Sequence, residues 1–285
     1  MPGIKLTVIG GGSGYTPELA GGIIKRHAEF PVGEIALADV EEGAQKVRII
    51  EAFLKRMFKR AGLSVNVWST LDRRSALKGS DFIVSQFRAG GLDARSKDEK
   101  IPLRFGIVGQ ETTGPGGFAN ALRAIPVALE ICRDMEELCP DAWLINFTNP
   151  SGIISEAVSR HSRVRCIGLC NIPVNMEREI CKTLGLEPGR IRCRFAGLNH
   201  LSVIGRLFID GMDALEGKGG SNLIQGSVAK NIAGPEIPPE FVDAFGFIPS
   251  PYLKYYYLKE SMLRDAMEKY GREGATRADE VRKVE

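Results

Sequence analysis

The first 170 residues alternate short apolar runs with segments of helical periodicity, and this alternation constrains the fold more than any other feature. The runs predict buried strands at Ile4–Ile9, Ile35–Ala38, Val65–Trp68, Phe82–Ser85, Trp143–Asn146 and Cys166–Leu169. Between them, an apolar repeat of about 3.6 residues predicts helices at Thr16–His27, Gly43–Ala61, Asp72–Leu77, Ala119–Leu138, Ser151–Ser162 and Val174–Leu184. Because β-branched runs alternate with helices, we expect a doubly wound α/β fold with a parallel, Rossmann-like sheet covered on both faces.

The pattern changes after Leu184. Arg192–Leu198 and Ser202–Asp210 alternate apolar and polar residues, which predicts a pair of antiparallel strands. A Gly- and Pro-rich stretch follows from Gly217 to Pro239, and a helical tail starts at Tyr252. We therefore predict a Rossmann-like domain in residues 1–170 and a smaller, incomplete α+β domain in residues 171–285.

Composition and charge narrow the classes of partner. A net charge of +3, without a block of Lys and Arg, argues against a nucleic acid. No run of about 18 apolar residues is present to cross a membrane, and we expect no signal peptide because a strand begins at Ile4. The six cysteines have no paired CxxC spacing, which predicts reduced thiols in a cytoplasmic protein.

The glycine-rich turn after the first strand, GGGSGYT, is typical of a dinucleotide site. Gly10 and Gly12 match the first two positions of the fingerprint, whereas Tyr15 stands at the third, where Gly or Ala is usual. Asp39 ends the second predicted strand, where a carboxylate can accept hydrogen bonds from both ribose hydroxyls and would repel a 2′-phosphate. These residues favour NAD over NADP. The alternative is a set of turn glycines that bind some other phosphate.

Three polar stretches accompany the predicted sheet. The segments 86–92 and 146–152 follow strands, at the edge where ligands bind in such sheets. The segment 109–117 is rich in glycine and leads into a helix; it is either a mobile surface loop or a lid that brings Glu111 into the site. Asn149 has two open interpretations, since it could cap the next helix or donate to a sugar hydroxyl.

Cys170 and His200 are a candidate pair of metal ligands. Each residue taken singly is more often part of a protein core. A thiolate and an imidazole together would leave most of a coordination shell open, which suits a catalytic metal better than a structural one. The segment PYLKYYY, from Pro251 to Tyr257, is rich in phenols, and spacing alone selects none of them.

Seven motifs, in this order and at these distances, closely resemble glycoside hydrolase family 4: GGGSGYTPEL, FRAGG, GIVGQETTGPGG, NFTNPSG, GLCNIP, GLNHLS and PYLKYYY. The resemblance runs along essentially the whole chain. Family members typically continue beyond the last residue of this sequence, so the resemblance implies a C-terminally shortened member. Members hydrolyse sugars with NAD and a divalent metal, usually manganese.

The resemblance also implies a substrate class. Relatives that act on α-glucosides resemble CDMP at the motif around Cys170, and their Asp can protonate the leaving group. Here Asn171 takes that place, and an amide cannot act as a general acid. The CN(V/I)P form resembles the 6-phospho-β-glucosidases. The expected substrate is a phosphorylated disaccharide or an aryl 6-phospho-β-glucoside, and the expected full-length form is a homo-oligomer, either a dimer or a tetramer.

The mechanism that the resemblance implies is redox-assisted elimination. NAD⁺ would take a hydride from C3 of the sugar, and a metal held by Cys170 and His200 would polarise the C2 and C3 oxygens. Tyr252 matches the family's base and would remove the C2 proton, and Glu111 matches an acidic residue that raises the basicity of this tyrosine. The C1–O bond would then break, water would add, and NADH would return the hydride.

Further roles follow from the same resemblance. Arg95, Asn149 and Asn171 match substrate-binding positions, and Arg277 matches a substrate arginine that suits the 6-phosphate. The residues that we expect to contact the cofactor are Gly10, Gly12, Ser13, Tyr15, Thr16, Asp39 and Arg88.

Two other functions remain open. A 2-hydroxy-acid dehydrogenase would have a similar sheet and a similar cofactor turn, but it needs a His–Asp relay and no metal. Metal dependence of the activity would separate it from a family 4 enzyme. The other alternative is a shortened chain that binds NAD without turnover.

Overall fold

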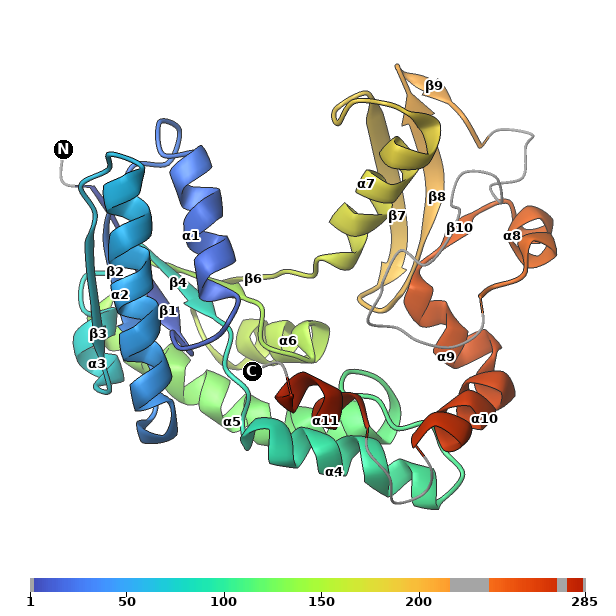
Figure 1. Cartoon of the computed structure of the whole chain (residues 1–285), viewed down its shortest axis with the longest axis horizontal. Helices are drawn as coiled ribbons and strands as arrows, with labels where there is room; N and C mark the ends of the chain where they lie inside the picture. Colours follow the sequence, from blue (N-terminus) through green and yellow to red (C-terminus); the bar gives the residue numbers. More distant parts are fainter. Residues whose placement is uncertain (1–2, 216–235, 271–275, 284–285) are drawn as a thin grey trace. The chain divides into compact units, whose positions relative to one another are not determined.

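The computed structural model describes residues 3–215, 236–270 and 276–283 (Figure 1). Most of the Gly- and Pro-rich stretch predicted at Gly217–Pro239 therefore lies outside the described residues. The chain divides into two compact units. The first unit comprises Met1–Ser96, Gly117–Leu169 and Ala278–Glu285, and the second unit comprises Lys97–Gly116 and Cys170–Arg277.

The first unit contains a six-stranded sheet in the order β3-β2-β1-β4-β5-β6, and every neighbouring pair is parallel. The strands are β1 (Ile4–Ile9), β2 (Val32–Ala38), β3 (Asn66–Thr70), β4 (Phe82–Ser85), β5 (Trp143–Asn146) and β6 (Arg165–Gly168). β1 pairs with both β2 and β4, so the strand order reverses beside it. In open α/β sheets this reversal marks the edge where ligands bind. The predicted parallel, Rossmann-like sheet is confirmed.

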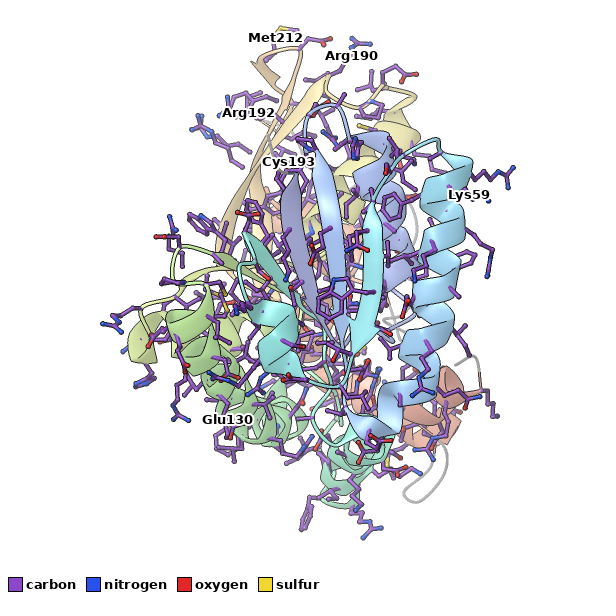
Figure 2. All side chains as sticks on the ribbon, turned by 90° about the vertical axis from the view of Figure 1, so that its left-hand side faces the viewer. Lys59, Glu130, Arg190, Arg192, Cys193 and Met212 are labelled. Atoms are coloured by element: carbon purple, nitrogen blue, oxygen red, sulfur yellow. The ribbon has the colours of Figure 1, made fainter. Side chains whose placement is uncertain are left out.

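Helices cover both faces of this sheet (Figure 1). The helical segments up to residue 161 are α1 (Thr16–Lys25), η1 (Glu41–Gly43), α2 (Ala44–Arg60), α3 (Arg73–Leu77), α4 (Gly91–Arg104), α5 (Gly114–Leu138) and α6 (Ser151–His161). Successive side chains of a strand point to opposite faces. Thus Ile35 and Leu37 pack with residues of α1 and α2, whereas Ala36 and Ala38 pack with residues of α3, α5 and α6. Lys59 of α2 points away from the sheet (Figure 2).

Helix α4 was not predicted from the sequence. α4 follows the FRAGG motif and has a polar sequence, GLDARSKDEKIPLR, with Pro102 inside it. Few apolar residues recur at helical spacing in this segment, and periodicity therefore gives it little signal. α5 also begins five residues before the predicted Ala119, through a glycine-rich stretch that has low helix propensity.

The second unit is a smaller α+β structure, as predicted. Its strands are β7 (Ile191–Leu198), β8 (Leu201–Ile209), β9 (Met212–Asp213) and β10 (Ile248–Pro249), and they form an antiparallel sheet in which β8 pairs with the other three. Its helical segments are α7 (Ile172–Leu184), α8 (Pro239–Phe245), η3 (Pro251–Leu253), α9 (Lys254–Tyr257) and α10 (Lys259–Tyr270), while α11 (Arg277–Arg282) belongs to the first unit from Ala278 onward.

The core of the second unit lies between α7 and one face of this sheet. Met176 and Ile180 of α7 share a buried cluster with Ile204 and Leu207 of β8. Arg190 and Arg192 lie at the open end of the β7–β8 hairpin, away from its turn, and both are exposed (Figure 2). Within the described residues, no helix is both long enough and apolar enough to cross a membrane.

Candidate functional site

The glycine-rich turn connects β1 to α1 at the ligand edge of the parallel sheet. The N–H groups of Gly10 and Gly11 both donate to the carbonyl of Ala38, at 2.9 and 3.0 Å. A Cβ on Gly10 would lie 3.0 Å from the backbone of Gln86, and φ there is +83°. A Cβ on Gly11 would lie 2.7 Å from Leu37 Cβ. Both positions therefore require glycine because the turn is pressed against two neighbouring strands.

The other predicted cofactor residues of the turn have different environments. The Thr16 hydroxyl is buried, donates to the Gly11 carbonyl at 2.9 Å, and accepts from Gln86 Nε2 at 2.6 Å. Ser13 Oγ accepts from Tyr15 N–H at 3.3 Å, and the Tyr15 side chain is exposed. Thr16 thus stabilises the turn from within. The expected cofactor contacts of these residues stay predictions.

The Asp39 carboxylate lies directly beside the turn. Its Oδ2 accepts from Gly12 N–H at 2.7 Å, and its Oδ1 accepts from Val40 N–H at 2.9 Å. A carboxylate offers about four lone-pair sites, so both oxygens keep capacity for hydroxyl donors. A Cβ on Gly43 would lie 2.3 Å from Oδ1. The carboxylate is therefore held on one side by backbone donors and packed on the other against a glycine.

Three further predicted residues, Arg88, Arg95 and Asn149, belong to the first unit and are partly buried. Arg88 follows β4, and its carbonyl accepts from Gly91 N–H at 3.1 Å. Arg95 lies on α4. The interpretation of Asn149 as a helix cap is wrong, because Pro150 occupies the N-cap of α6 and no side chain caps it.

The segment around Asn149 is shaped by a buried amide that the sequence analysis did not single out. Asn146 is completely buried, and its Oδ1 accepts from Ser85 Oγ at 2.8 Å and from Thr148 N–H at 3.2 Å. The Asn149–Pro150 peptide bond is cis. A polar residue that ends a buried parallel strand, as Asn146 ends β5, is the signal that could have identified it.

In the second unit, the structure brings Cys170 and His200 together. Cys170 Sγ lies 3.6 Å from His200 Nε2. Two ligands of one ion, each about 2.0–2.3 Å from the metal, span such a separation. His200 occupies the β7–β8 turn with φ of 62°, which is uncommon for a residue other than glycine. This backbone conformation accompanies a buried imidazole.

Tyr252 completes the cluster. Its ring stacks on the His200 ring with a centroid separation of 3.6 Å and an interplanar angle of 7°. Ser250 caps η3 by accepting from Tyr252 N–H at 3.4 Å, and the tyrosine is 7% exposed. A phenol, an imidazole and a thiol therefore form one contact group inside a single unit.

Burial dominates the electrostatics of this group. It lowers the pKa of His200 to about 4, so the imidazole is neutral, the form that binds a metal. It also raises the pKa of Tyr252 to about 12. The side chains of Thr112 and Gln110 lower that tyrosine pKa, while the charges of Cys170 and Glu111 raise it further.

Cys170 and His200 suit a divalent metal as ligands, but two ligands leave its coordination shell incomplete. A neutral imidazole beside a thiol is a suitable pair of ligands for such an ion. Within the described parts of the chain, no group of three or more His, Cys, Asp or Glu side chains could hold a metal. Further ligands would have to come from substrate or water, as in catalytic sites with open positions.

Three more predicted site residues, Glu111, Asn171 and Arg277, lie in the second unit. Glu111 is buried, in the segment between α4 and α5, and close enough to Tyr252 to affect its pKa. Its neighbours Gln110 and Thr112 were missed as site residues, although the GQETTG stretch itself was noted. Asn171 is exposed at the N-cap of α7 and makes no capping bond, and Arg277 is exposed at the start of α11.

Comparison with known sequences decides the family. The profile of family 4 glycosyl hydrolases matches residues 5–186, and that of the family's C-terminal domain matches residues 195–285. The chain belongs to family 4 of the glycosyl hydrolases. The resemblance inferred from the seven motifs is thereby confirmed.

Curated relatives of this family 4 member include several phosphoglucosidases. It is 46% identical to a probable 6-phospho-beta-glucosidase of Bacillus subtilis (strain 168), and 45% identical to a 6-phospho-beta-glucosidase of Escherichia coli (strain K12). Each alignment covers 99% of this chain and 64% of the relative. The chain therefore spans just under two thirds of the length of the relatives that it matches.

Solved structures of family 4 proteins have the same fold. The 6-phospho-beta glucosidase from Thermotoga maritima, solved with NAD and glucose-6-phosphate, matches with a TM-score of 0.87 at 35% identity. That match covers 99% of this chain and 64% of the other. The lactate dehydrogenase from Eimeria maxima matches with a TM-score of 0.55 at 15% identity, which shows a shared fold alone. It therefore gives no support to the dehydrogenase alternative.

Proposed function

We propose that this family 4 glycosyl hydrolase hydrolyses 6-phospho-β-glucosides with the help of NAD and a divalent metal, most simply Mn²⁺. The observation that carries the proposal is the contact group in the second unit, where Tyr252 stacks on His200 and His200 lies 3.6 Å from Cys170. A base beside a pair of soft and borderline ligands suits proton abstraction next to a polarised oxygen. The names of the relatives support the same substrate class.

Each unit has its own part in the proposal. In the first unit, the turn at Gly10 and Gly12, together with Ser13, Tyr15, Thr16, Asp39 and Arg88, binds NAD. In the second unit, Cys170 and His200 hold the metal. When bound, NAD supplies a hydride acceptor and the metal supplies a Lewis acid. We propose a functional boundary between residues 170 and 171, whereas the compact units divide one residue earlier, between Leu169 and Cys170.

Tyr252 is the proposed base, and it takes the proton from C2 of the sugar. Burial raises the pKa of its phenol to about 12, so its conjugate base is strong, but the phenol must first lose its own proton, which the positive charge of a bound metal would favour. Glu111 acts on Tyr252 through its charge, since a nearby negative charge disfavours a second one and raises the pKa. This gives the carboxylate its proposed role of increasing the basicity of the tyrosine.

Selectivity for the β-linked substrate is proposed to depend on Asn171. An amide at this position cannot protonate the leaving group. We assign Arg95 and Asn149 to sugar contacts and Arg277 to the 6-phosphate, because a guanidinium can bind a phosphate through two parallel hydrogen bonds. The proposed substrate is a phosphorylated disaccharide or an aryl 6-phospho-β-glucoside. We further propose a cytoplasmic location and a homo-oligomeric full-length form, a dimer or a tetramer.

A chromogenic aryl 6-phospho-β-glucoside tests the proposal. We expect release of the chromophore only when NAD⁺ and Mn²⁺ are both present, and we expect the amount of NAD⁺ to be unchanged afterwards. The matched α-anomer is the control for selectivity, and it should react at least about tenfold more slowly, a difference of about 1.4 kcal/mol in activation free energy. Turnover that survives complete removal of nucleotide would rule the proposal out.

A further inference from the structure

Two buried amides hold the backbone of the loop that follows β5. Asn146 binds both backbone groups of Thr148, since its Oδ1 accepts from Thr148 N–H and its Nδ2 donates to the Thr148 carbonyl, each at 3.2 Å. Asn120 Nδ2 donates to the Asn149 carbonyl, also at 3.2 Å. A carbonyl can only accept, so this contact identifies the donor as the amide nitrogen of Asn120. The path of the loop therefore depends on side chains that bind its backbone.

Asn120 reaches this loop from α5, and both belong to the first unit. Asn120 is 4% exposed, whereas Ala121 and Ala124 on the same helix are buried apolar residues. A buried amide costs free energy unless its polar atoms are hydrogen-bonded. The bond to the Asn149 carbonyl offsets part of that cost, and it ties the helix to the loop.

The side chain of Asn149 itself is left available. Asn149 is partly buried, and within the described parts of the chain its side chain makes no hydrogen bond to the protein. Asn120 binds Asn149 through the backbone carbonyl, so this contact uses none of the side-chain groups. A ligand can therefore use the amide oxygen and both N–H donors. The loop follows the carboxyl end of β5, the edge where ligands bind in such sheets.

We propose that Asn120 is a positioning residue, which fixes the backbone of Asn149 so that the Asn149 amide meets a hydroxyl of the phosphorylated sugar. The inference deepens the proposed function and rests on it, because the sugar contact of Asn149 is assigned there. Asn120 acts on the sugar only through Asn149. A loop that is already held in its bound path loses less conformational freedom when the sugar binds. The effect of Asn120 should therefore appear in the affinity for the sugar.

Two variants of Asn120 and one control separate positioning from packing. Asn120→Asp keeps the shape and an accepting oxygen and loses the N–H donors. Asn120→Ser also removes the amide, and it introduces no buried charge. Cys132→Ala is the matched control, because Cys132 is buried on the same helix, about 18 Å further along the helix axis at a rise of about 1.5 Å per residue. Circular dichroism and denaturant titration establish that each variant is folded.

We expect both Asn120 variants to raise the KM for an aryl 6-phospho-β-glucoside by roughly 5- to 20-fold, with kcat within about threefold of the parent, because the lost contact contributes to binding in the ground state and the transition state alike. Calorimetric titration with glucose 6-phosphate, in the presence of NAD and Mn²⁺, should show a loss of affinity by a similar factor. Cys132→Ala should keep both constants within about twofold of the parent, since distant positions act independently.

A double-mutant cycle tests whether Asn120 acts through Asn149. Asn149→Ala should raise KM at least as much as Asn120→Asp does. Adding Asn120→Asp to Asn149→Ala should change KM by less than about twofold further, because no amide is left to position. Independent, additive effects of the two substitutions would overturn the inference.

The remaining outcomes distinguish the inference from the proposed function. If a folded Asn120→Asp or Asn120→Ser variant binds the sugar as well as Cys132→Ala does, while Asn149→Ala binds it weakly, the inference is wrong and the sugar contact of Asn149 stands. If neither Asn120 variant folds, Asn120 has a structural role and the inference is also wrong. An Asn149→Ala variant with the parental KM and affinity would remove the sugar contact and the inference together.

Discussion

At the scale of single residues, Asp39 and Gly43 depend on each other for their positions. The Asp39 carboxylate accepts from the N–H groups of Gly12 and Val40, at 2.7 and 2.9 Å. A Cβ on Gly43 would lie 2.3 Å from Asp39 Oδ1, well inside van der Waals contact. A glycine outside the glycine-rich turn thus determines where the carboxylate can present its remaining lone pairs. In the proposed function these lone pairs meet the ribose hydroxyls of NAD.

Gly43→Ala should therefore weaken NAD binding by about tenfold, equivalent to about 1.4 kcal/mol. The added methyl group displaces the carboxylate and disturbs its bond to Gly12 N–H. Isothermal titration with NAD measures the change. Gly22→Ala in α1 is the matched control, since a Cβ there meets no atom within 4 Å. It should leave NAD binding unchanged and raise the free energy of unfolding by about 0.5–1 kcal/mol. Equal affinities in the two variants would contradict this dependence.

Sequence reasoning could find Asp39 but not Gly43. Asp39 ends a predicted strand at a known distance from the glycine-rich turn, so its position along the chain carries its meaning. Gly43 is one of 33 glycines, and nothing near it in the sequence distinguishes it. Its importance arises from the close approach of the carboxylate, which exists only in the folded chain.

At the scale of elements, α5 anchors one face of the parallel sheet. Ile131, Cys132 and Met135 are almost completely buried in the cluster that contains the sheet residues Ile83 and Leu144. Their spacing places them on one side of the helix. Each large buried apolar side chain contributes about 1.5–3 kcal/mol through removal from water. The helix therefore stabilises the sheet whose ligand edge carries the glycine-rich turn.

Ile131→Ala should lower the free energy of unfolding by about 2–5 kcal/mol, because it removes buried methyl groups and leaves a cavity. The adjacent Glu130 points away from the rest of the structure (Figure 2) and is exposed. Glu130→Ala should change stability by less than about 0.5 kcal/mol. Denaturant titration of the two variants measures the difference, and similar midpoints would show that α5 is not anchored through this face.

Because the thiol of Cys132 is buried, we expect the folded protein to lose stability at alkaline pH. Burial raises the pKa of its thiol from 9.0 to about 11. Since the folded pKa lies above the unfolded one, the contribution of this group is complete below pH 9 and is lost as the pH rises through 11. Its full loss corresponds to about 2–3 kcal/mol. Unfolding measured between these limits should be less pH-dependent in Cys132→Ala. A slope equal to that of the parent would contradict the prediction.

At the scale of the whole molecule, the candidate nucleotide residues and the candidate metal ligands belong to different units. Gly10, Gly12 and Asp39 are in the first unit, and Cys170 and His200 are in the second. The two units have separate buried clusters. The two binding functions should therefore be separable by mutation.

Cys170→Ser and His200→Ala should each weaken Mn²⁺ binding by at least about tenfold. Mutation of a residue that only supports a metal ligand already lowers metal affinity by about 10- to 100-fold, and loss of the ligand itself should lower it at least as much. NAD affinity should stay within about twofold of the parent, because the candidate nucleotide residues belong to the other unit. Gly43→Ala should show the reverse pattern. Calorimetric titration of each variant with each ligand provides the test. Loss of both affinities in Cys170→Ser, with the fold intact by circular dichroism, would show that the sites are not independent.

The sequence by itself was enough to predict the parallel sheet of the first unit and to single out Cys170 and His200 for the candidate site. Ile4–Ile9, Phe82–Ser85 and Trp143–Asn146 are strands with the predicted bounds, because a buried parallel strand is a local apolar run with its own turn signals. Cys170 and His200 could be paired as ligands because few other side chains have their chemistry. Polar α4 had no such local signal.

Only the tertiary structure decided which groups surround the reactive ones. The stack of Tyr252 on His200 joins residues from distant parts of the sequence, and the contact of Gly43 with Asp39 depends on the path of a turn. Periodicity in the sequence shows which side of a helix or strand is buried, because the side chains on one side recur at a fixed spacing along the chain. Hydrogen bonds between distant segments depend on how the whole chain packs, and no local pattern contains them.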